Sequence, residues 1–269
     1  MTFQEMLREQ VIIIDGATGT MVQALDLSDR DFGGSDYKML SDLLVFSRPD
    51  DMRKIHLAYF EAGANAVETN TFGASPMRLS EYNFRGLDLA AFAQIPYGVD
   101  LRALSYDDFA YYLSRRGAEV ACEARAQYKA GPDYDGRPLF VLGSIGPSNR
   151  VLSSTKADLT VSTFEAIMEN FYHQVRGLIE GGADVLLYET QQDILELKAA
   201  IMGGQKAMRV LGKQIPIMAQ VTVDQYGKMQ IFNTDIHAAL VTLEGIGIDV
   251  FGINCSIGPD LMEKTVEKI

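Results

Sequence analysis

Cysteine is scarce in this sequence, and its scarcity excludes one class of protein. Cys122 and Cys255 are the only two cysteines among 269 residues. Two thiols cannot build the disulfide framework of a small secreted domain, so we expect a reducing, cytoplasmic location. A chemical role for either thiol would therefore depend on other groups that the fold brings close to it.

Long apolar runs and an excess of positive charge are also missing. No apolar stretch approaches the roughly 20 residues needed to cross a bilayer, and residues 1–10 lack the basic start and apolar middle of a signal peptide. The formal net charge of −12, with no basic patch, argues against nucleic acid as a partner. We therefore expect a soluble globular protein without a membrane or nucleic-acid partner, which agrees with 47% hydrophobic and 22% charged residues.

The stretch that says most about function lies near the end of the sequence, at residues 248–259. Residues 250–253 form a short apolar run that predicts a buried strand, and Asn254, Cys255 and Ser256 stand at its end. A glycine and a proline then indicate a turn into a helix. An isolated cysteine is most commonly a small core residue. At a strand end it can also bind a metal or act as a nucleophile, provided that other groups lie nearby.

Helix, glycine and strand follow one another three times along the chain. Residues 59–69, 178–190 and, more weakly, 243–255 share the order helix end, glycine, buried strand and polar strand end. This repeated unit is typical of α/β folds with a parallel sheet. Polar strand ends favour a TIM-type (β/α)8 barrel, and the missing Rossmann fingerprint disfavours a doubly wound sheet. A closed barrel needs eight strands, whereas we predict about six βα units, so the barrel is truncated or the fold is open; the strands begin near residues 11, 64, 139, 184, 216 and 249.

The first predicted strand, residues 11–14, is a β-branched run of the kind that is covered on both faces. The loop after it reads Asp-Gly-Ala-Thr-Gly-Thr, and its glycines, Gly16 and Gly19, let the backbone expose N–H groups to a ligand. Asp15 either offers its carboxylate to a ligand or caps a tight turn. The loop is not a phosphate-binding P-loop, because the lysine is missing.

One stretch departs from the repeated pattern. Residues 86–136 hold six tyrosines and two prolines, and we expect the segment near residues 90–112 to be a surface insertion on a βα connection. Residues 118–129 predict a helix that carries Cys122 among small apolar residues, and we interpret this cysteine as a core residue.

If the barrel prediction holds, all the strand ends meet at one face. Carboxylates and backbone N–H groups there would suit the ammonium and carboxylate of an amino acid. A thiolate suits a soft metal such as zinc, although catalytic zinc needs about three protein ligands. The histidines fall in predicted helices or turns, and we interpret them as ordinary surface or core residues. The face would collect Asp15, Gly16, Thr69, Ser144, Glu189, Asn254 and Cys255, but not His56, His173 or His237.

Five segments in this order resemble the homocysteine S-methyltransferase family, and within it most closely the N-terminal homocysteine-binding domains of cobalamin-dependent methionine synthases. Each motif alone is weak, but five in sequence at strand ends are specific. The resemblance covers nearly the whole chain apart from the tyrosine-rich insertion. The segments are residues 15–20, 68–72, 143–147, 188–193 and 252–259.

The resemblance implies a homocysteine-binding (β/α)8 barrel over residues 1–269, incomplete at its C-terminus, with zinc at the strand-end face. It implies that Cys255 is the catalytic residue and the first of three zinc-binding thiolates. The family's other two cysteines are adjacent in a Gly-Gly-Cys-Cys-Gly type motif, which has no counterpart in this sequence. It further implies that Asp15, Gly16, Thr69 and Glu189 hold the amino acid part of homocysteine, while Ser144 and Asn254 shape the site.

The implied reaction transfers a methyl group to the homocysteine thiolate and gives methionine. The implied donor is methylcobalamin or methyltetrahydrofolate, bound outside this chain by further domains or chains. Because its zinc site is incomplete, we expect the isolated chain to bind zinc weakly and to show little activity. Two alternatives stay open: a non-catalytic amino acid binding module, or a split subunit that a partner chain completes. A metal-free lyase or aldolase with Glu189 and Asp15 as acid and base is disfavoured, because no strand-end lysine is available for a Schiff base.

Overall fold

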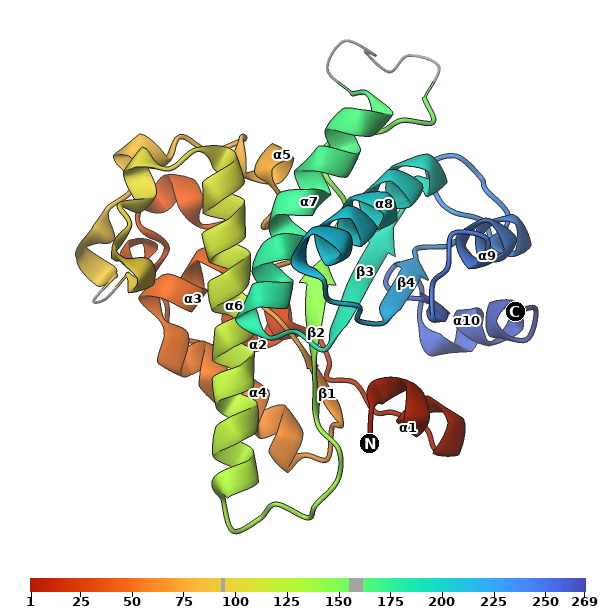
Figure 1. Cartoon of the computed structure of the whole chain (residues 1–269), viewed down its shortest axis with the longest axis horizontal. Coiled ribbons are helices and arrows are strands. Elements are labelled where there is room, and N and C mark those ends of the chain that lie inside the picture. The colour runs from red at the N-terminus through yellow and green to blue at the C-terminus, as the bar shows by residue number, and fades with distance from the viewer. Residues whose placement is uncertain (93–94, 155–161) are drawn as a thin grey trace.

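The computed structural model describes residues 1–92, 95–154 and 162–269, and a parallel sheet forms its centre (Figure 1). Five strands lie side by side in sequence order, and each runs parallel to its neighbour. Helices connect consecutive strands, so the predicted α/β class and the partial TIM-type barrel are confirmed. The strands are β1 (Ala66–Glu68), β2 (Phe140–Ile145), β3 (Val185–Gln191), β4 (Ile217–Val221) and β5 (Val250–Ile253).

The first predicted strand is reduced to a single bridge. Ile14 pairs in parallel with Ala66 of β1, which places this run at the edge of the sheet. The prediction that the run is covered on both faces is wrong, since Val11 is 85% exposed and Ile13 is 58% exposed. Ile12 and Ile14 do pack against the inner face of the sheet. An edge segment with one neighbour leaves alternate side chains in solvent.

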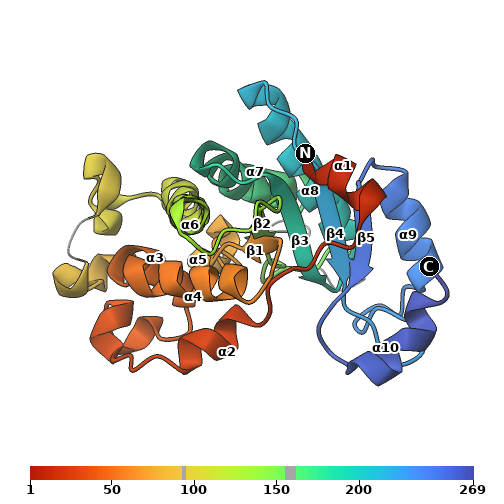
Figure 2. The same ribbon diagram turned by 90° about the horizontal axis from the view of Figure 1, so that it is seen from below.

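Helices α6, α7 and α8 lie side by side against one face of the sheet, and α4 packs on α6 (Figures 1 and 2).

In the described ranges, none of the helices combines the length and the apolar character that spanning a bilayer requires. The helices are α1 (Phe3–Glu9), α2 (Thr18–Gln23), α3 (Leu44–Ser47), α4 (Pro49–Glu61), α5 (Pro76–Leu79), α6 (Tyr106–Ala130), α7 (Phe164–Gly181), α8 (Ile194–Leu211), α9 (Ile236–Glu244) and α10 (Pro259–Val266).

Alternation along the strands divides the core into two layers. In β3, Leu186 and Tyr188 face the outer helices, whereas Leu187 faces the inner cluster. Phe3 and Met6 of α1 fill this inner cluster, and Gln4 donates a hydrogen bond to Asp249, just before β5. Helix α1 therefore closes the inner face at the N-terminal ends of the strands, and the opposite ends stay accessible (Figure 2).

The segment near residues 90–112, for which we expect a surface insertion, also contributes to the core. Residues 93 and 94 lie outside the described residues. Leu101 and Phe109 are completely buried, and residues 106–112 form the start of α6. These side chains share a cluster with Tyr37, Leu40 and Leu43, which lie in the connection between α2 and α3. Short 3-10 turns build both segments: η1 (Asp29–Phe32), η2 (Ser35–Tyr37), η3 (Ser41–Leu43), η4 (Phe84–Gly86), η5 (Leu89–Ala91), η6 (Pro96–Gly98) and η7 (Leu101–Ala103).

Glycines let the outer helices approach one another closely. A Cβ atom on Gly177 of α7 would clash with the backbone carbonyl oxygen of Tyr111 in α6. A Cβ atom on Gly203 of α8 would clash with the carbonyl oxygen of Met168 in α7. Because backbone atoms cannot move aside as flexible side chains can, these two contacts fix the spacing of the layer that supports the sheet.

We predict that Gly177→Ala lowers the free energy of unfolding by about 1–3 kcal/mol, the range for an overpacked core. The matched control is Gly19→Ala in α2, where an added Cβ meets no atom within 4 Å. That change should leave the stability unchanged or raise it by up to about 1 kcal/mol through helix propensity. Urea denaturation measures both variants, and equal effects would contradict the proposed close contact.

Candidate functional site

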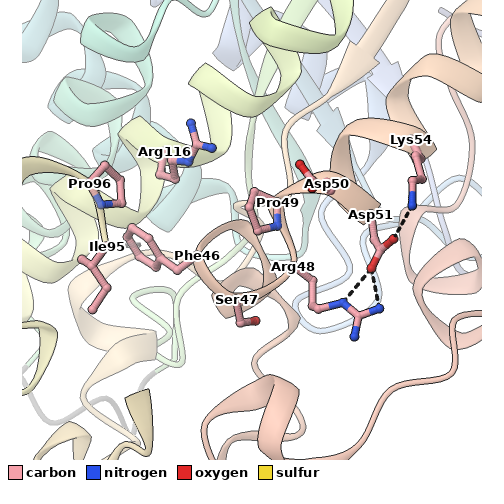
Figure 3. Close-up of a pocket in the computed structure, with 10 residues that line it drawn as sticks. All are labelled: Phe46, Ser47, Arg48, Pro49, Asp50, Asp51, Lys54, Ile95, Pro96 and Arg116. Atoms are coloured by element: carbon pink, nitrogen blue, oxygen red, sulfur yellow. Dashed lines mark hydrogen bonds and ion pairs between the residues drawn. The ribbon is translucent and has the colours of Figure 1, made fainter. Parts of the chain in front are cut away.

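One cavity, of about 750 Å³, is lined by residues that lie away from the strand ends. Figure 3 shows these residues. This cavity is lined by α3, the start of α4 and α6, and its charges are already compensated. Arg48 and Lys54 both contact Asp51, and Arg116 forms an ion pair with Glu123. Since these cations have partners within the protein, the cavity presents no charge that calls for a ligand.

A second cavity, of about 600 Å³, lies at the C-terminal ends of the strands. Every site residue that the sequence predicts lines it, while their individual roles stay predictions. The three histidines, which we interpret as ordinary surface or core residues, are not among the described residues that line this cavity. The predicted residues in the lining are Asp15, Gly16, Thr69, Ser144, Glu189, Asn254 and Cys255.

Asp15 joins the first run of the chain to β1. Both oxygens of its carboxylate accept from the backbone N–H of Glu68, at 3.1 and 3.0 Å. It therefore does not cap the turn that follows it, and α2 begins without a side-chain cap. Burial raises the pKa of Asp15 to about 7; the Glu68 N–H opposes this rise and the Glu189 carboxylate adds to it.

Hydroxyl groups connect the ends of β1, β2 and β3. The hydroxyl of Ser144 donates to Oε1 of Glu189, and the backbone N–H of Ser144 donates to Oγ1 of Thr69 at 2.9 Å. Thr69 is almost completely buried and also shares a hydrogen bond of 2.6 Å with Thr71. Burial raises the pKa of Glu189, and the Ser144 hydroxyl opposes the rise. Thr69 is thus engaged in joining two strands, whereas Glu189 keeps an oxygen for a ligand.

Side-chain hydrogen bonds on either side of Cys255 hold it at the cavity. Asn254 accepts from the backbone N–H of Thr190 at 2.9 Å and donates to the hydroxyl of Thr190 at 3.0 Å. The hydroxyl of Ser256 donates to the carbonyl oxygen of Val223 at 2.5 Å. Cys255 and Ser256 both have φ of 63°, a left-handed conformation that is uncommon outside glycine. The thiol of Cys255 is exposed to this cavity rather than buried in the core.

The sequence prediction missed Glu68, which also lines the cavity. Burial, and then the charges of Glu189 and Asp15, raise the pKa of Glu68 well above its ordinary value. Its position immediately before Thr69, at the end of a buried strand, is the signal that could have identified it. Gln220 of β4 is a second residue of the lining that was missed.

No group of three histidine, cysteine, aspartate or glutamate residues within the described ranges has a geometry that could hold a metal. Cys122 cannot supply a second thiol, because it lies on α6 and its thiol donates to the carbonyl oxygen of Gly182. Burial raises the pKa of this thiol to about 11, so it is not a ready thiolate. The described residues therefore give a zinc ion one thiol, Cys255, where a catalytic site needs about three protein ligands.

Fold and cavity together define a (β/α)-barrel protein with an acidic cavity and one thiol at the C-terminal strand ends. The chain belongs to the homocysteine S-methyltransferase family, which matches residues 12–269. This match confirms the resemblance that the sequence motifs indicate.

Two relatives are methionine synthases. That of Mycobacterium tuberculosis (strain ATCC 25618 / H37Rv) is 36% identical over 260 residues, and that of Mycobacterium leprae (strain TN) is 35% identical over 260 residues. Each match covers 97% of this chain and 19% of the relative. The chain thus spans about a fifth of the length of these curated relatives.

Solved structures of the homocysteine methyltransferase MmuM from Escherichia coli are similar in fold. The metallated form has a TM-score of 0.70 at 23% identity, over 97% of this chain and 80% of that chain. The apo form has a TM-score of 0.67 at 22% identity, over 98% and 79%.

Asp42 and its neighbour Ser41 hold the loop that follows β1 and borders the cavity. Asp42 is 5% exposed, and its Oδ1 accepts from the backbone N–H of Gly73 at 2.8 Å. The neighbouring Ser41 accepts at its carbonyl oxygen from the side chain of Asn70 at 2.8 Å. Residues 41 and 42 therefore hold the loop that follows β1. Burial raises the pKa of Asp42 from 3.8 to about 6.

We predict that Asp42→Asn stabilises the protein in a pH-dependent manner. The raised pKa means that the charged carboxylate costs folding free energy, so wild-type stability is full below pH 3.8 and falls as the pH rises through 6. Asparagine keeps the acceptor for Gly73 and carries no charge. The free energy of unfolding of the variant should exceed that of the wild type by about 3 kcal/mol at pH 8. At pH 3.5 the two values should be nearly equal. Urea denaturation at both pH values checks this, and an equal offset at the two would contradict it.

Proposed function

We propose that this chain binds homocysteine in the strand-end cavity and presents its thiol for methylation, which gives methionine. The observation that carries the proposal is that one cavity collects all seven residues predicted from the family motifs. The methionine synthase relatives and the family membership support it. Asp15 and Glu189 would accept hydrogen bonds from the ammonium group of homocysteine, and the backbone at Gly16 would face its carboxylate.

In this reaction the methyl carbon leaves its donor and bonds to the homocysteine sulfur, which has given up its proton. The chain's own residues would bind and orient the amino acid, so that the sulfur points toward Cys255 and solvent. The donor, methylcobalamin or methyltetrahydrofolate, would be carried by further domains or chains. A cytoplasmic location, where Cys255 stays reduced, belongs to the same proposal.

The zinc site is the part of the proposal that the described residues support least, because they supply only one thiol ligand, Cys255. We propose Cys255 as one zinc ligand, with the remaining ligands supplied from outside residues 1–269. Bound there, zinc would stabilise the substrate as a thiolate. Ser144 and Asn254 would shape the site by holding Glu189 and the segment that carries Cys255.

The single thiol also favours a second candidate. A chain with one metal ligand can serve as a non-catalytic amino acid binding module, or as a split subunit that a partner chain completes. The lyase or aldolase alternative gains no support, because lysine is absent from the described residues that line the cavity.

We predict that the 269-residue chain alone binds zinc weakly and forms little methionine. Adding a polypeptide with the adjacent cysteine pair should raise both zinc affinity and methionine formation, if the pair reaches the cavity. Competition with a chromogenic chelator measures zinc binding, and a methionine assay with a supplied donor measures activity. Robust activity of the chain alone, without added metal, would contradict the zinc proposal.

In the completed protein, Cys255→Ser should abolish tight zinc binding, a larger loss than the roughly 10–100-fold that removing an outer partner costs. Cys122→Ser is the matched control and should leave zinc affinity unchanged, because Cys122 lies on α6, away from the cavity. Persistent methionine formation by Cys255→Ser would show that the metal role assigned to this residue is wrong.

A further inference from the structure

The strand-end cavity carries an unbalanced charge. Its lining contains the carboxylates of Asp15, Glu68 and Glu189, and no lysine, arginine or histidine among the described residues. The larger cavity offers a contrast within the same molecule, because its arginines and lysine are paired with carboxylates (Figure 3). A ligand of the strand-end cavity therefore has to supply the positive charge that the protein does not.

Glu68 is the carboxylate whose acceptor capacity is unused. Asp15 accepts from the backbone N–H of Glu68, and Glu189 accepts from the hydroxyl of Ser144. The Glu68 carboxylate accepts no hydrogen bond within the described part of the chain, and the residue is partly exposed at the cavity lining. A charged acceptor that is partly withdrawn from water and has no protein donor costs free energy, and a donor from a ligand would recover part of that cost.

We propose that Glu68 is a third substrate-binding carboxylate, which with Asp15 and Glu189 makes the cavity select ligands that carry a primary ammonium group. The inference rests on the proposed function and extends it to Glu68, which opens the motif at residues 68–72 but is not among the site residues predicted from the sequence. An ammonium group has three N–H donors, so it can address three carboxylates at once.

Geometry favours an ammonium over a bare metal ion among these carboxylates. A hard cation requires oxygens at about 2.0–2.6 Å from one centre, and the described side chains form no group close enough to hold such an ion. Charge-assisted N–H···O contacts of about 2.7–2.9 Å tolerate a wider spread of oxygens around the nitrogen.

Calorimetric titration of the 269-residue chain tests the proposal with two classes of ligand. Homocysteine, methionine and norleucine carry the ammonium group, and 4-sulfanylbutanoate is homocysteine without it. For Glu68→Gln we expect about tenfold or greater weakening of the ammonium ligands and no weakening of 4-sulfanylbutanoate. Glu68→Asp, which keeps the charge, should retain part of the affinity. The matched control is Glu61→Gln at the exposed end of α4, which should bind all ligands as the wild type does.

The titrations distinguish failure of this inference from failure of the proposed function. If the wild type binds methionine or norleucine but not homocysteine, the proposed substrate is wrong, and Glu68 keeps its role if Glu68→Gln weakens those ligands. Unchanged affinity in Glu68→Gln, or equal loss for 4-sulfanylbutanoate, overturns the role of Glu68. A wild type that binds none of the ammonium ligands overturns both. Unfolding without ligand at pH 8 provides the folding check, since loss of a buried charge should not lower the stability of Glu68→Gln.

Discussion

Parallel pairing in sequence order is the constraint on which this structure depends. Because all five strands run the same way, their C-terminal ends come together from segments more than 180 residues apart. The polar residues that follow each strand then meet without any single strand carrying a complete site. Three hydrogen bonds fix these ends relative to one another: Asp15 accepts from β1, Ser144 donates to β3, and Asn254 accepts from β3. The register of the sheet therefore sets the geometry of the cavity.

The same arrangement places charge where it is unfavourable for folding. Asp15, Glu68 and Glu189 lie partly out of water and near one another, and burial raises the pKa of each. In the unliganded protein the carboxylates act against stability as the pH rises, since their charged forms are disfavoured. Such destabilised groups are typical of sites that are organised for a ligand rather than for the stability of the empty protein.

Much of the fold and of the site could be predicted from local sequence signals. Gly63 after α4 and Gly182 after α7 mark helix ends that the structure confirms, with φ of 109° and 100°. The remainder depends on contacts between distant segments. The exposure of Val11 depends on which strands are its neighbours, and the burial of Leu101 and Phe109 depends on residues some 60 positions earlier in the chain. Glu68 was missed because a single acidic residue after an apolar run also marks an ordinary strand boundary.

Helix α1 affects how small molecules reach the strand-end cavity. Its side chains Phe3 and Met6 fill the inner face at the N-terminal ends of the strands. A small molecule that occupies the strand-end cavity therefore approaches it from the side away from α1.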